Sequence, residues 1–498
     1  MRAQFGLGRL AAVTGRVEEA ETYLRQAVQA SIQIADPILR FDAHFYAGDL
    51  AARRGRPELA ATYFEQAQEI ARLNGDAMQE GRALRGLSIA ARLRGDLHFA
   101  LTLAEAALAL QLAAGDRFGA SVTHTNVLAA LYELGAWDRL LRLAAEALQL
   151  KESLGDRHGA AIVRHMQGLA AYWLGDFAAA RQSLQLALQG FEAVQDRRTA
   201  ALARNVLGLV AEAGGKTDTA VELLAAALAA AKAVGAATEA AYAAHDLGTL
   251  HLQCGDAAAA IPLLEHARAV WQEQGSVLLE LKSAAWLGLA WQQQGEVQLA
   301  EQIAASQLAR WREGVPSGEA PQSWLWALQQ LLTRLGRTAD AEEVTRAAFS
   351  ELQRQASEIQ DDALRQRFFA GLPLHRAITA AYVQLHAAQR RIRVTLARAD
   401  APLGRTLLPD EQVAVEWTIQ APEDEAISDP TLRRRSILRR LVTEAAAQGA
   451  APTDADLAAA LRVSRRTILR DIEALTRTGV DLPTRRRAAA STDNTLSQ

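Results

Sequence analysis

Hydrophobic and polar positions repeat every 40 residues along residues 1–316. One series of breaks in this pattern falls at Gly15, Gly55, Gly95, Gly135, Gly175, Gly215, Gly255 and Gly295. A second series lies midway, at Gly75, Gly115, Gly155, Gly235 and Gly275, with Gln195 in its gap. The segments between breaks are about 17 residues long, enough for about four or five helical turns. Each period therefore predicts two helices, and the repeated period predicts an array of helical hairpins.

Small residues recur at the same interval inside the predicted helices. The first helix of the hairpin carries a glycine at one position in six periods, namely Gly8, Gly48, Gly168, Gly208, Gly248 and Gly288. The second helix carries two recurring alanines, which are Ala20 and Ala27 in the first period. A glycine inside a helix costs about 1 kcal/mol relative to alanine, so its recurrence indicates that a neighbouring helix approaches closely there.

These positions resemble the tetratricopeptide repeat (TPR), with Leu-Gly in the first helix and two alanines in the second. The period of 40 is similar to the longer variant of this repeat found in bacterial signalling regulators. The resemblance implies an all-α fold, in which residues 1–316 form eight repeats of a right-handed superhelical solenoid with a concave groove. Gly8 already belongs to a first helix, so the first repeat is truncated, and an upstream signalling domain is compatible with the sequence.

The strict period ends after residue 316. Residues 317–388 are predicted to hold a degenerate ninth repeat, around Gly336, and helices that close the array, which gives about nine hairpins in all. Apolar and polar residues then alternate over 392–396 and over 413–419, which predicts two β-strands. The stretch 421–430 is acidic and contains prolines. We therefore interpret residues 389–430 as a short β-hairpin and an acidic linker.

Residues 431–487 are helical in pattern and basic. They hold 13 arginines and 6 acidic residues, a net charge of +7 in a chain whose total is −3. Leu432, Ile437, Leu438, Leu441 and Val442 form one apolar stripe of a first helix. Thr453 or Asp454 can cap a short second helix, and Ser464 can cap a third helix whose buried face holds Ile468, Ile472 and Leu475.

Residues 456–472 are similar to the helix-turn-helix of DeoR-type and biotin-repressor-type winged domains. The small Ala458, the turn Val463-Ser464, and Arg-Thr-Ile followed by Arg-Asp-Ile all match. The resemblance implies a (winged) helix-turn-helix domain over 431–487, with a wing after Gly479 and a disordered tail over 488–498. A small helical bundle with a solvated basic face is the alternative interpretation.

In a helix-turn-helix, the second helix of the motif enters the major groove with its N-terminal residues toward the base edges. Arginine can pair with guanine through two hydrogen bonds, and further arginines meet phosphates. By resemblance we place Arg465, Arg466 and Arg470 at the major groove, and Ser464 and Thr467 near the DNA backbone. Phosphate contacts are assigned to Arg462, Arg485, Arg486 and Arg487. The implied partner is double-stranded DNA.

Composition narrows the remaining functions. Cys254 is the only cysteine, so no intrachain disulfide can form and a cytoplasmic location is expected. No apolar run approaches the ~20 residues of a membrane span. The sequence 214–217, Gly-Gly-Lys-Thr, lacks the first glycine of a phosphate-binding loop. We predict no catalytic residues, no cofactor and no metal site, and hence a protein that is not an enzyme.

The groove of the solenoid is the other candidate site. Arginine and aromatic side chains dominate binding hot spots. First-helix residues of this kind that should face inward are Arg85, Arg92, Tyr132, His165, Tyr172, Trp173, Asn205 and His245. A solvated face combined with packing between repeats is the competing interpretation for each of them.

Two functional hypotheses follow. In the first, the chain is a bacterial DNA-binding transcription regulator whose solenoid binds a protein, peptide or small ligand. In the second, it is a TPR scaffold, or the regulatory half of a larger signalling ATPase, with no direct role at DNA. The operator sequence, the groove partner, the oligomeric state and the choice between activation and repression are not encoded in any recognisable pattern.

Overall fold

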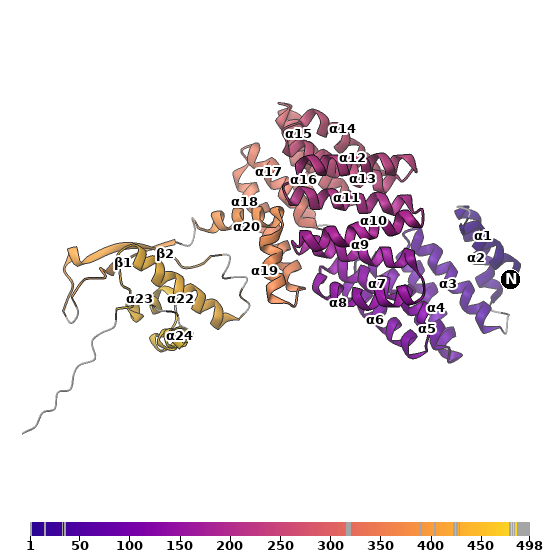
Figure 1. Cartoon of the computed structure of the whole chain (residues 1–498), viewed down its shortest axis with the longest axis horizontal. Coiled ribbons are helices and arrows are strands. Elements are labelled where there is room, and N and C mark those ends of the chain that lie inside the picture. The colour runs from indigo at the N-terminus through magenta and orange to yellow at the C-terminus, as the bar shows by residue number, and fades with distance from the viewer. Residues whose placement is uncertain are drawn as a thin grey trace, which may run out of the picture. The chain divides into compact units, whose positions relative to one another are not determined.

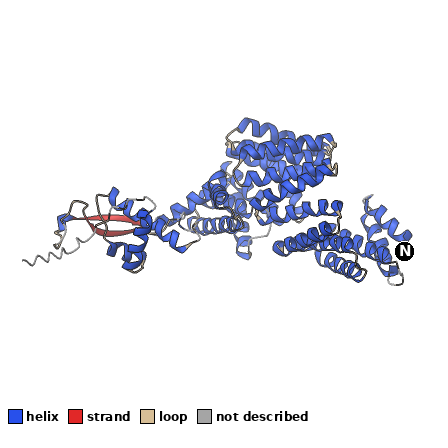
Figure 2. Ribbon diagram, turned by 60° about the horizontal axis from the view of Figure 1, so that its bottom comes forward, coloured by secondary structure: helices blue, strands red, loops and turns tan. Residues whose placement is uncertain are grey.

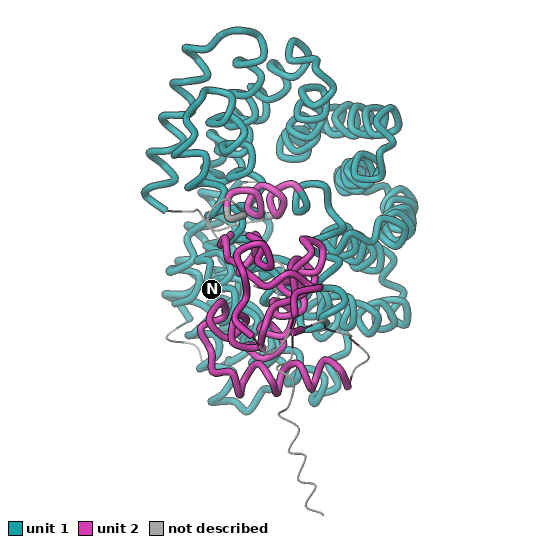
Figure 3. Tube along the Cα trace, turned by 90° about the vertical axis from the view of Figure 1, so that its left-hand side faces the viewer, with its two compact units in different colours: residues 1–376 teal, residues 377–498 magenta. Residues whose placement is uncertain are grey.

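The structure is a computed structural model that divides into a solenoid unit, residues 1–376, and a C-terminal unit, residues 377–498 (Figure 3). It describes residues 2–13, 16–31, 33, 36–314, 320–387, 391–402, 405–421, 424, 427, 429–477, 480, 482, 484 and 485. The fold class predicted from the sequence is confirmed: a helical repeat solenoid, a two-stranded antiparallel hairpin and a small helical C-terminal region.

Nine hairpins form the solenoid unit within the described residues (Figure 1). Their first helices are α1 (Arg2–Val13), α3 (Pro37–Arg53), α5 (Ala77–Leu93), α7 (Arg117–Leu134), α9 (Arg157–Trp173), α11 (Arg197–Ala213), α13 (Ala237–Gln253), α15 (Val277–Gln293) and α17 (Pro321–Arg334). Their second helices are α2 (Val17–Ser31), α4 (Pro57–Leu73), α6 (Leu97–Ala113), α8 (Trp137–Ser153), α10 (Phe177–Ala193), α12 (Thr217–Ala233), α14 (Ala257–Glu273), α16 (Val297–Glu313) and α18 (Thr338–Ser357). Two further helices follow, α19 (Asp362–Gly371) and α20 (Pro373–Ala387), and α20 crosses the boundary between the units.

Both series of breaks are left-handed turns, as the glycine pattern indicates. The glycines of both series that the structure describes have positive φ, from +64° at Gly75 to +89° at Gly255 and Gly295. Gln195 fills its gap in the same conformation, with φ +58°. Aspartates cap many of the following helices; Asp116, for example, accepts a 2.8 Å hydrogen bond from Gly119 N. Two local signals therefore set the helix boundaries, an αL residue that ends one helix and a capping side chain that begins the next.

The recurring helical glycines have the packing role that the sequence predicted. A Cβ atom built on Gly168 would lie 2.5 Å from Leu184 Cγ, and one on Gly208 would lie 2.7 Å from Leu224 Cδ2. Both leucines belong to the second helix of the same hairpin. First helices of successive hairpins also pack against one another, which places them on the inner side of the curved array. The inner layer is therefore built from α1, α3, α5 and their odd-numbered successors.

The C-terminal unit combines a hairpin with three helices (Figure 2). Strand β1 (Arg391–Ala397) pairs antiparallel with β2 (Gln412–Thr418), with Val394 opposite Val415, and a short 3-10 helix, η1 (Pro409–Glu411), precedes β2. The helices are α22 (Pro430–Ala447), α23 (Asp454–Leu461) and α24 (Arg465–Arg477). Among the described residues, no helix is long and apolar enough to cross a membrane.

The hairpin predicted within residues 389–430 is present, and it is part of the core of this unit. Leu396, Val415 and Trp417 are buried together with Leu438 and Leu441 of α22. The end of β1 also bonds to the segment between α22 and α23, through Ala451 N to Ala397 O at 3.0 Å. The alternating strands bury one apolar face, and α22 supplies the surface that covers it.

No strand is found after α24 among the residues described there, Val480, Leu482, Thr484 and Arg485. The wing that we expected after Gly479 is therefore absent from these positions. The two strands that the structure describes in this unit both precede α22. Gly479 itself, Arg486, Arg487 and the tail 488–498 fall outside the described residues.

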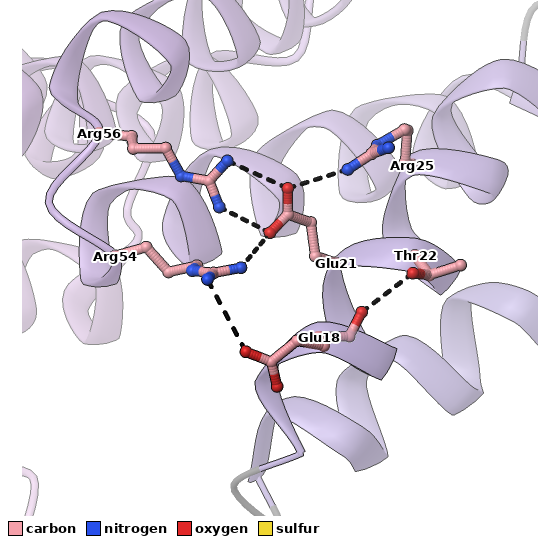
Figure 4. Close-up of polar contacts among 6 residues, drawn as sticks. All are labelled: Glu18, Glu21, Thr22, Arg25, Arg54 and Arg56. Carbon is pink, nitrogen blue, oxygen red and sulfur yellow. Dashed lines mark hydrogen bonds and ion pairs between the residues drawn. The ribbon is translucent and has the colours of Figure 1, made fainter.

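The first two hairpins are joined by an ion-pair cluster around Glu21 of α2 (Figure 4). Its carboxylate accepts hydrogen bonds from Arg56 Nη2 at 2.6 Å, from Arg25 Nη2 at 2.9 Å and from Arg54. Arg54 and Arg56 lie in the turn between α3 and α4. The hydrogen bond from Arg56, more than any other contact, lowers the pKa of Glu21 to about 2. The cluster therefore ties the terminal hairpin to its neighbour while Glu21 is ionised.

We expect Glu21→Gln to loosen α1 and α2 at neutral pH by about 1 kcal/mol or less, because the glutamine keeps the shape but loses the charge. The folded pKa lies below the ordinary value of 4.5, so this stability is present above about pH 4.5 and is lost as the pH falls toward 2. Amide hydrogen exchange in α2 of the full chain measures it, as a faster exchange that converges with wild type below pH 4.5. Glu19→Gln, which removes only the exposed pair with Arg16, is the control. Equal exchange of the Glu21 variant and wild type at pH 7 would contradict the expectation.

Candidate functional site

The inner layer of the solenoid encloses a cavity of about 350 Å³. Its wall comes from the five first helices α7 to α15, from the start of α17 and from residues at the α19–α20 junction. The lining is mainly aromatic and aliphatic, with a few polar groups, as in sites that bind small molecules and peptides. Six of the eight groove residues predicted from the sequence line it: Tyr132, His165, Tyr172, Trp173, Asn205 and His245.

The repeat period explains why these residues meet. His165, Asn205 and His245 occupy the same position in α9, α11 and α13, 40 residues apart. Because each hairpin stacks on the last with the same geometry, equivalent positions form a row along the inner layer. Tyr132 and Tyr172 form a second row by the same argument.

Arg85 and Arg92 lie on the same rows but outside the cavity. Arg85 is the α5 counterpart of His165, and Arg92 is the α5 counterpart of Tyr132. Arg92 forms an ion pair with Glu133 of α7 at 2.5 Å. Arg85 lies with its guanidinium 5.8 Å from the ring centre of Phe45. The structure therefore separates the predicted groove residues into a central cavity and an arginine-containing stretch toward the N-terminus.

Hydrogen bonds hold several of the cavity side chains in place. Trp173 Nε1 donates to the Tyr132 hydroxyl at 3.1 Å, and Asn205 Nδ2 donates to Asp246 Oδ2 at 2.6 Å. His245 Nδ1 lies 3.0 Å from Ser283 Oγ. These bonds link neighbouring first helices, so the polar groups of the cavity are positioned before any ligand binds.

Two buried polar atoms of the cavity lack a hydrogen-bond partner among the residues that the structure describes. They are His165 Nδ1 and Asn205 Oδ1, which lie in the same row on adjacent helices. A buried polar atom without a partner costs about 1–3 kcal/mol, so such atoms call for an explanation. A ligand that offers a donor to Asn205 and a complementary group to His165 would remove this cost.

The cavity histidines are neutral at physiological pH. Burial lowers the pKa of His165 to about 4. Burial, together with the nearby charge of Lys282, lowers the pKa of His245 to about 3. Each ring is therefore uncharged, with one donor and one acceptor nitrogen, and in His245 the Nδ1 position is already bonded to Ser283 Oγ.

One carboxyl group beside this row titrates near neutrality. Burial, and then the negative charge of Asp246, raise the pKa of Glu212 to about 7. Such shifts are frequent at functional sites and also occur in buried structural clusters. Nowhere in the described part of the chain, this cavity included, do three His, Cys, Asp or Glu side chains gather in a way that could hold a metal ion.

Sequence reasoning missed the residues that reach the cavity from the far end of the unit. Leu372 and Leu374 line it, and His375 packs 4.2 Å from the ring centre of Phe368. The turn of the fifth repeat permits this approach, because a Cβ built on Gly175 would lie 2.5 Å from Gly371 Cα. Residues 317–388 were predicted to include helices that close the array, but no local pattern indicates which repeats those helices contact.

The second candidate site is the exposed face of α24 in the C-terminal unit. Ile468 and Ile472 are buried, whereas Arg466, Leu469 and Arg470 are exposed on the opposite face. Ser464 caps the helix as predicted, accepting a 3.2 Å hydrogen bond from Thr467 N. The elements follow in the order of a short α23, a turn and a longer α24.

The predicted DNA-contacting arginines differ in their surroundings. Arg462, Arg466 and Arg470 are exposed and form no ion pair with a described carboxylate. Arg465 is bound to Asp454 of α23, with Nη2 2.7 Å from Oδ2. Arg485 is partly buried and donates to the Pro402 carbonyl. Arg486 lies outside the described residues.

Several arginines of α22 have structural roles. Arg434 Nε and Arg435 Nε lie 2.6 Å and 3.0 Å from the carboxylate oxygens of Asp471, a buried residue of α24. Arg440 similarly pairs with buried Asp424. Because a buried carboxylate needs such partners, Arg434 and Arg435 fix α24 on α22, and Arg440 holds residue 424 against the same helix.

The comparisons with known proteins concern both regions. Residues 374–489 match a family described as "Protein of unknown function (DUF1670)", which covers the C-terminal unit and less than half of the chain. No curated protein matches the sequence.

Three solved structures illustrate the likeness of the solenoid. A Rap protein complexed with competence and sporulation factor has 12% identity and a TM-score of 0.53, over 72% of this chain and 98% of that one. The apo form of RapI has 12% identity and a TM-score of 0.51, over 72% and 99%. The apo quorum sensor NprR from B. thuringiensis has 15% identity and a TM-score of 0.48, over 62% and 86%. At 12% identity, the two structures with TM-scores above 0.5 show a likeness of fold alone, so the conclusion is that the solenoid has a TPR-like helical repeat fold.

Proposed function

We propose that this chain is a DNA-binding transcription regulator whose solenoid binds a peptide or a similar extended ligand. The two sites lie in different units, so each half of the proposal rests on its own observation. The alternative is a TPR scaffold, or the regulatory part of a signalling ATPase, in which the C-terminal unit makes no contact with DNA.

The exposed face of α24 carries the DNA half of the proposal. Arg466 and Arg470 are one helical turn apart, exposed, and free of ion pairs with the described carboxylates. Arg462 adds a third exposed cation at the turn before the helix. An exposed helix with an arginine row after a capped turn has the geometry of a recognition helix in the major groove. The exposed Leu469 between them could meet a thymine methyl group.

The cavity carries the ligand half of the proposal. It extends across five first helices, and its unpartnered His165 Nδ1 and Asn205 Oδ1 belong to successive members of one row. Such a row suits an extended chain, whose backbone presents donors and acceptors at regular intervals. The Rap protein of similar fold was solved with competence and sporulation factor bound, which supports a ligand-binding role for a solenoid of this type.

Titration of the full chain against duplex DNA at several salt concentrations tests the DNA half. Binding should weaken as salt rises, because each neutralised phosphate releases counterions. Four phosphate contacts would give a slope of about −3.6 in log K against log salt, or about a hundredfold loss between 50 and 200 mM. The absence of binding at 50 mM salt, or binding that salt does not weaken, would reject DNA recognition and favour the scaffold.

A further inference from the structure

The N-terminal part of the inner layer holds three arginines around one aromatic cluster. The cluster is formed by Phe41, Phe45 and Tyr46 of α3, with Phe41 and Phe45 stacked at 5.7 Å. The Arg82 guanidinium lies 4.7 Å from the Phe45 ring centre, and that of Arg85 lies 5.8 Å from the same ring. On the other side, Arg9 of α1 lies 4.6 Å from the ring centre of Tyr46. Cation–π contacts of this kind orient arginines and hold their planar groups in place.

Negative charge around these arginines is incomplete. Arg82 has one distant partner, Asp42 Oδ1 at 3.5 Å, and Asp49 is engaged by Arg53 at 3.0 Å. Arg85 forms no ion pair with any carboxylate in the described part of the chain. Burial, and then the charge of Arg82, lower the pKa of Arg85 below its ordinary value. A half-buried cation without a counterion is costly, and an external anion would compensate it.

The repeat register places this pair on the same surface as the cavity. Arg85 is equivalent to His165, Asn205 and His245, and Arg82 is equivalent to Leu202, Tyr242 and Lys282. All six of these counterparts line the cavity. Arg82 and Arg85 therefore continue its two rows, two hairpins closer to the N-terminus than His165.

We propose that Arg82 and Arg85 together bind a carboxylate of an extended peptide whose other part occupies the cavity. This inference rests on the proposed ligand-binding function of the solenoid and adds a chemical requirement to it. Both guanidinium groups lie beside the Phe45 ring, and each can donate hydrogen bonds to an oxygen of one carboxylate. The carboxylate belongs either to an acidic side chain or to the peptide's C-terminus.

The distance between the two sites sets the spacing in the peptide. Neighbouring packed helices lie about 8–10 Å apart, so the two hairpin steps from Arg85 to His165 span about 20 Å. An extended chain advances about 3.3 Å per residue, so about six residues connect the two sites. The expected ligand therefore has an acidic group about six residues from an apolar or aromatic anchor.

Selection of a random nonapeptide display library on the immobilised full chain is the first experiment. The expected result is enrichment of peptides that carry an acidic group about six residues from an apolar residue. A selected peptide is then synthesised in matched forms: with Asp replaced by Asn, and with the free C-terminus replaced by an amide. Whichever form removes the contacting carboxylate should bind about tenfold to a hundredfold more weakly, as measured by fluorescence anisotropy.

Arg85→Gln and Arg82→Gln test the residues themselves. When the peptide loses its carboxylate, its affinity for the Arg85→Gln variant should fall by less than about threefold. The reason is that this variant already lacks the arginine that the carboxylate contacts. Arg94→Gln, at an exposed position of the turn after α5, is the matched control and should retain the full effect. Arg85→Gln should also unfold at the same temperature as wild type or higher, since it removes a half-buried unpaired charge. That measurement separates a lost contact from a misfolded variant.

The outcomes distinguish this inference from the proposed function. Enrichment of peptides without an acidic group would overturn the carboxylate site and leave the solenoid a peptide-binding array. The site would also be overturned if Arg85→Gln and wild type lost the same affinity when the carboxylate is removed. If no peptide is enriched at all, the ligand-binding function fails, and the inference fails with it.

Discussion

Replacing Trp417 by alanine is expected to destabilise the C-terminal unit strongly while the stability of the solenoid is unchanged. The Trp417 ring is fully buried among β2, α22 and the rest of the unit's core. Its Nε1 donates a 2.9 Å hydrogen bond to the Leu441 carbonyl. Removal of a buried tryptophan side chain costs about 3–5 kcal/mol, a large part of the 5–15 kcal/mol that stabilises a typical domain.

Differential scanning calorimetry of the full chain measures this effect. We expect the transition of the C-terminal unit to fall by more than 10 °C, because 1 kcal/mol shifts a domain of this size by about 4–8 °C. The transition of the solenoid should be unchanged. Glu416→Ala, on the exposed face of the same strand, is the control and should cost less than about 1 kcal/mol. If Trp417→Ala melted like wild type, the hairpin would not contribute to the core.

The solenoid could be predicted from the sequence because its signals are local and repeated. The turn glycines and the capping aspartates each determine one helix boundary, and the period supplies many independent copies of the signal. The helical glycines predicted close packing without naming the partner. Gly208, for example, meets Leu224 of its own hairpin, whereas Gly288 meets Leu331 of α17.

The C-terminal unit shows which contacts local sequence patterns cannot predict, namely those between segments that are far apart in the chain. Alternation in the two strands predicted a hairpin with one apolar face, but nothing in it specifies that α22 covers that face. The sequence therefore predicted the hairpin but not its place in the core of the unit. The charge pattern likewise did not show which arginines are paired with a carboxylate. Arg434 and Arg435 look like a solvated basic flank until Asp471, 37 and 36 residues away, is brought beside them.

In the candidate sites, too, the residues that follow the repeat could be predicted, and those that depend on distant segments could not. Repeat register alone brought six predicted groove residues together around the cavity, because equivalent positions share a face. Leu372 and Leu374 could not be predicted, since their contact depends on a distant segment folding back onto α9 and its neighbours. For α24, the sequence assigned the same role, a contact in the major groove, to Arg465 and Arg466. Only the fold separates Arg465, bound to Asp454, from the unpaired Arg466.

The double replacement of Arg466 and Arg470 by alanine is expected to have the largest effect on DNA binding. Both side chains are exposed on the face of α24 opposite Ile468 and Ile472, so their removal should leave the core intact. A bidentate contact to guanine is worth about 1–3 kcal/mol of discrimination. The pair should therefore cost about 2–6 kcal/mol, roughly thirtyfold to ten-thousandfold in affinity, at a selected operator sequence.

The way in which the lost DNA affinity depends on sequence and on salt concentration reveals what each arginine contacts. An arginine that reads a base should relax the sequence preference at one position of the site and leave the salt dependence nearly unchanged. An arginine that meets a phosphate should weaken all sequences equally and reduce the salt slope by about 1. Arg477→Ala, in the same helix but paired with Glu473 at its C-terminal end, is the matched control and should change affinity little. If the double variant and the control bound alike, α24 would not be a recognition helix, and its exposed arginines would be a solvated face.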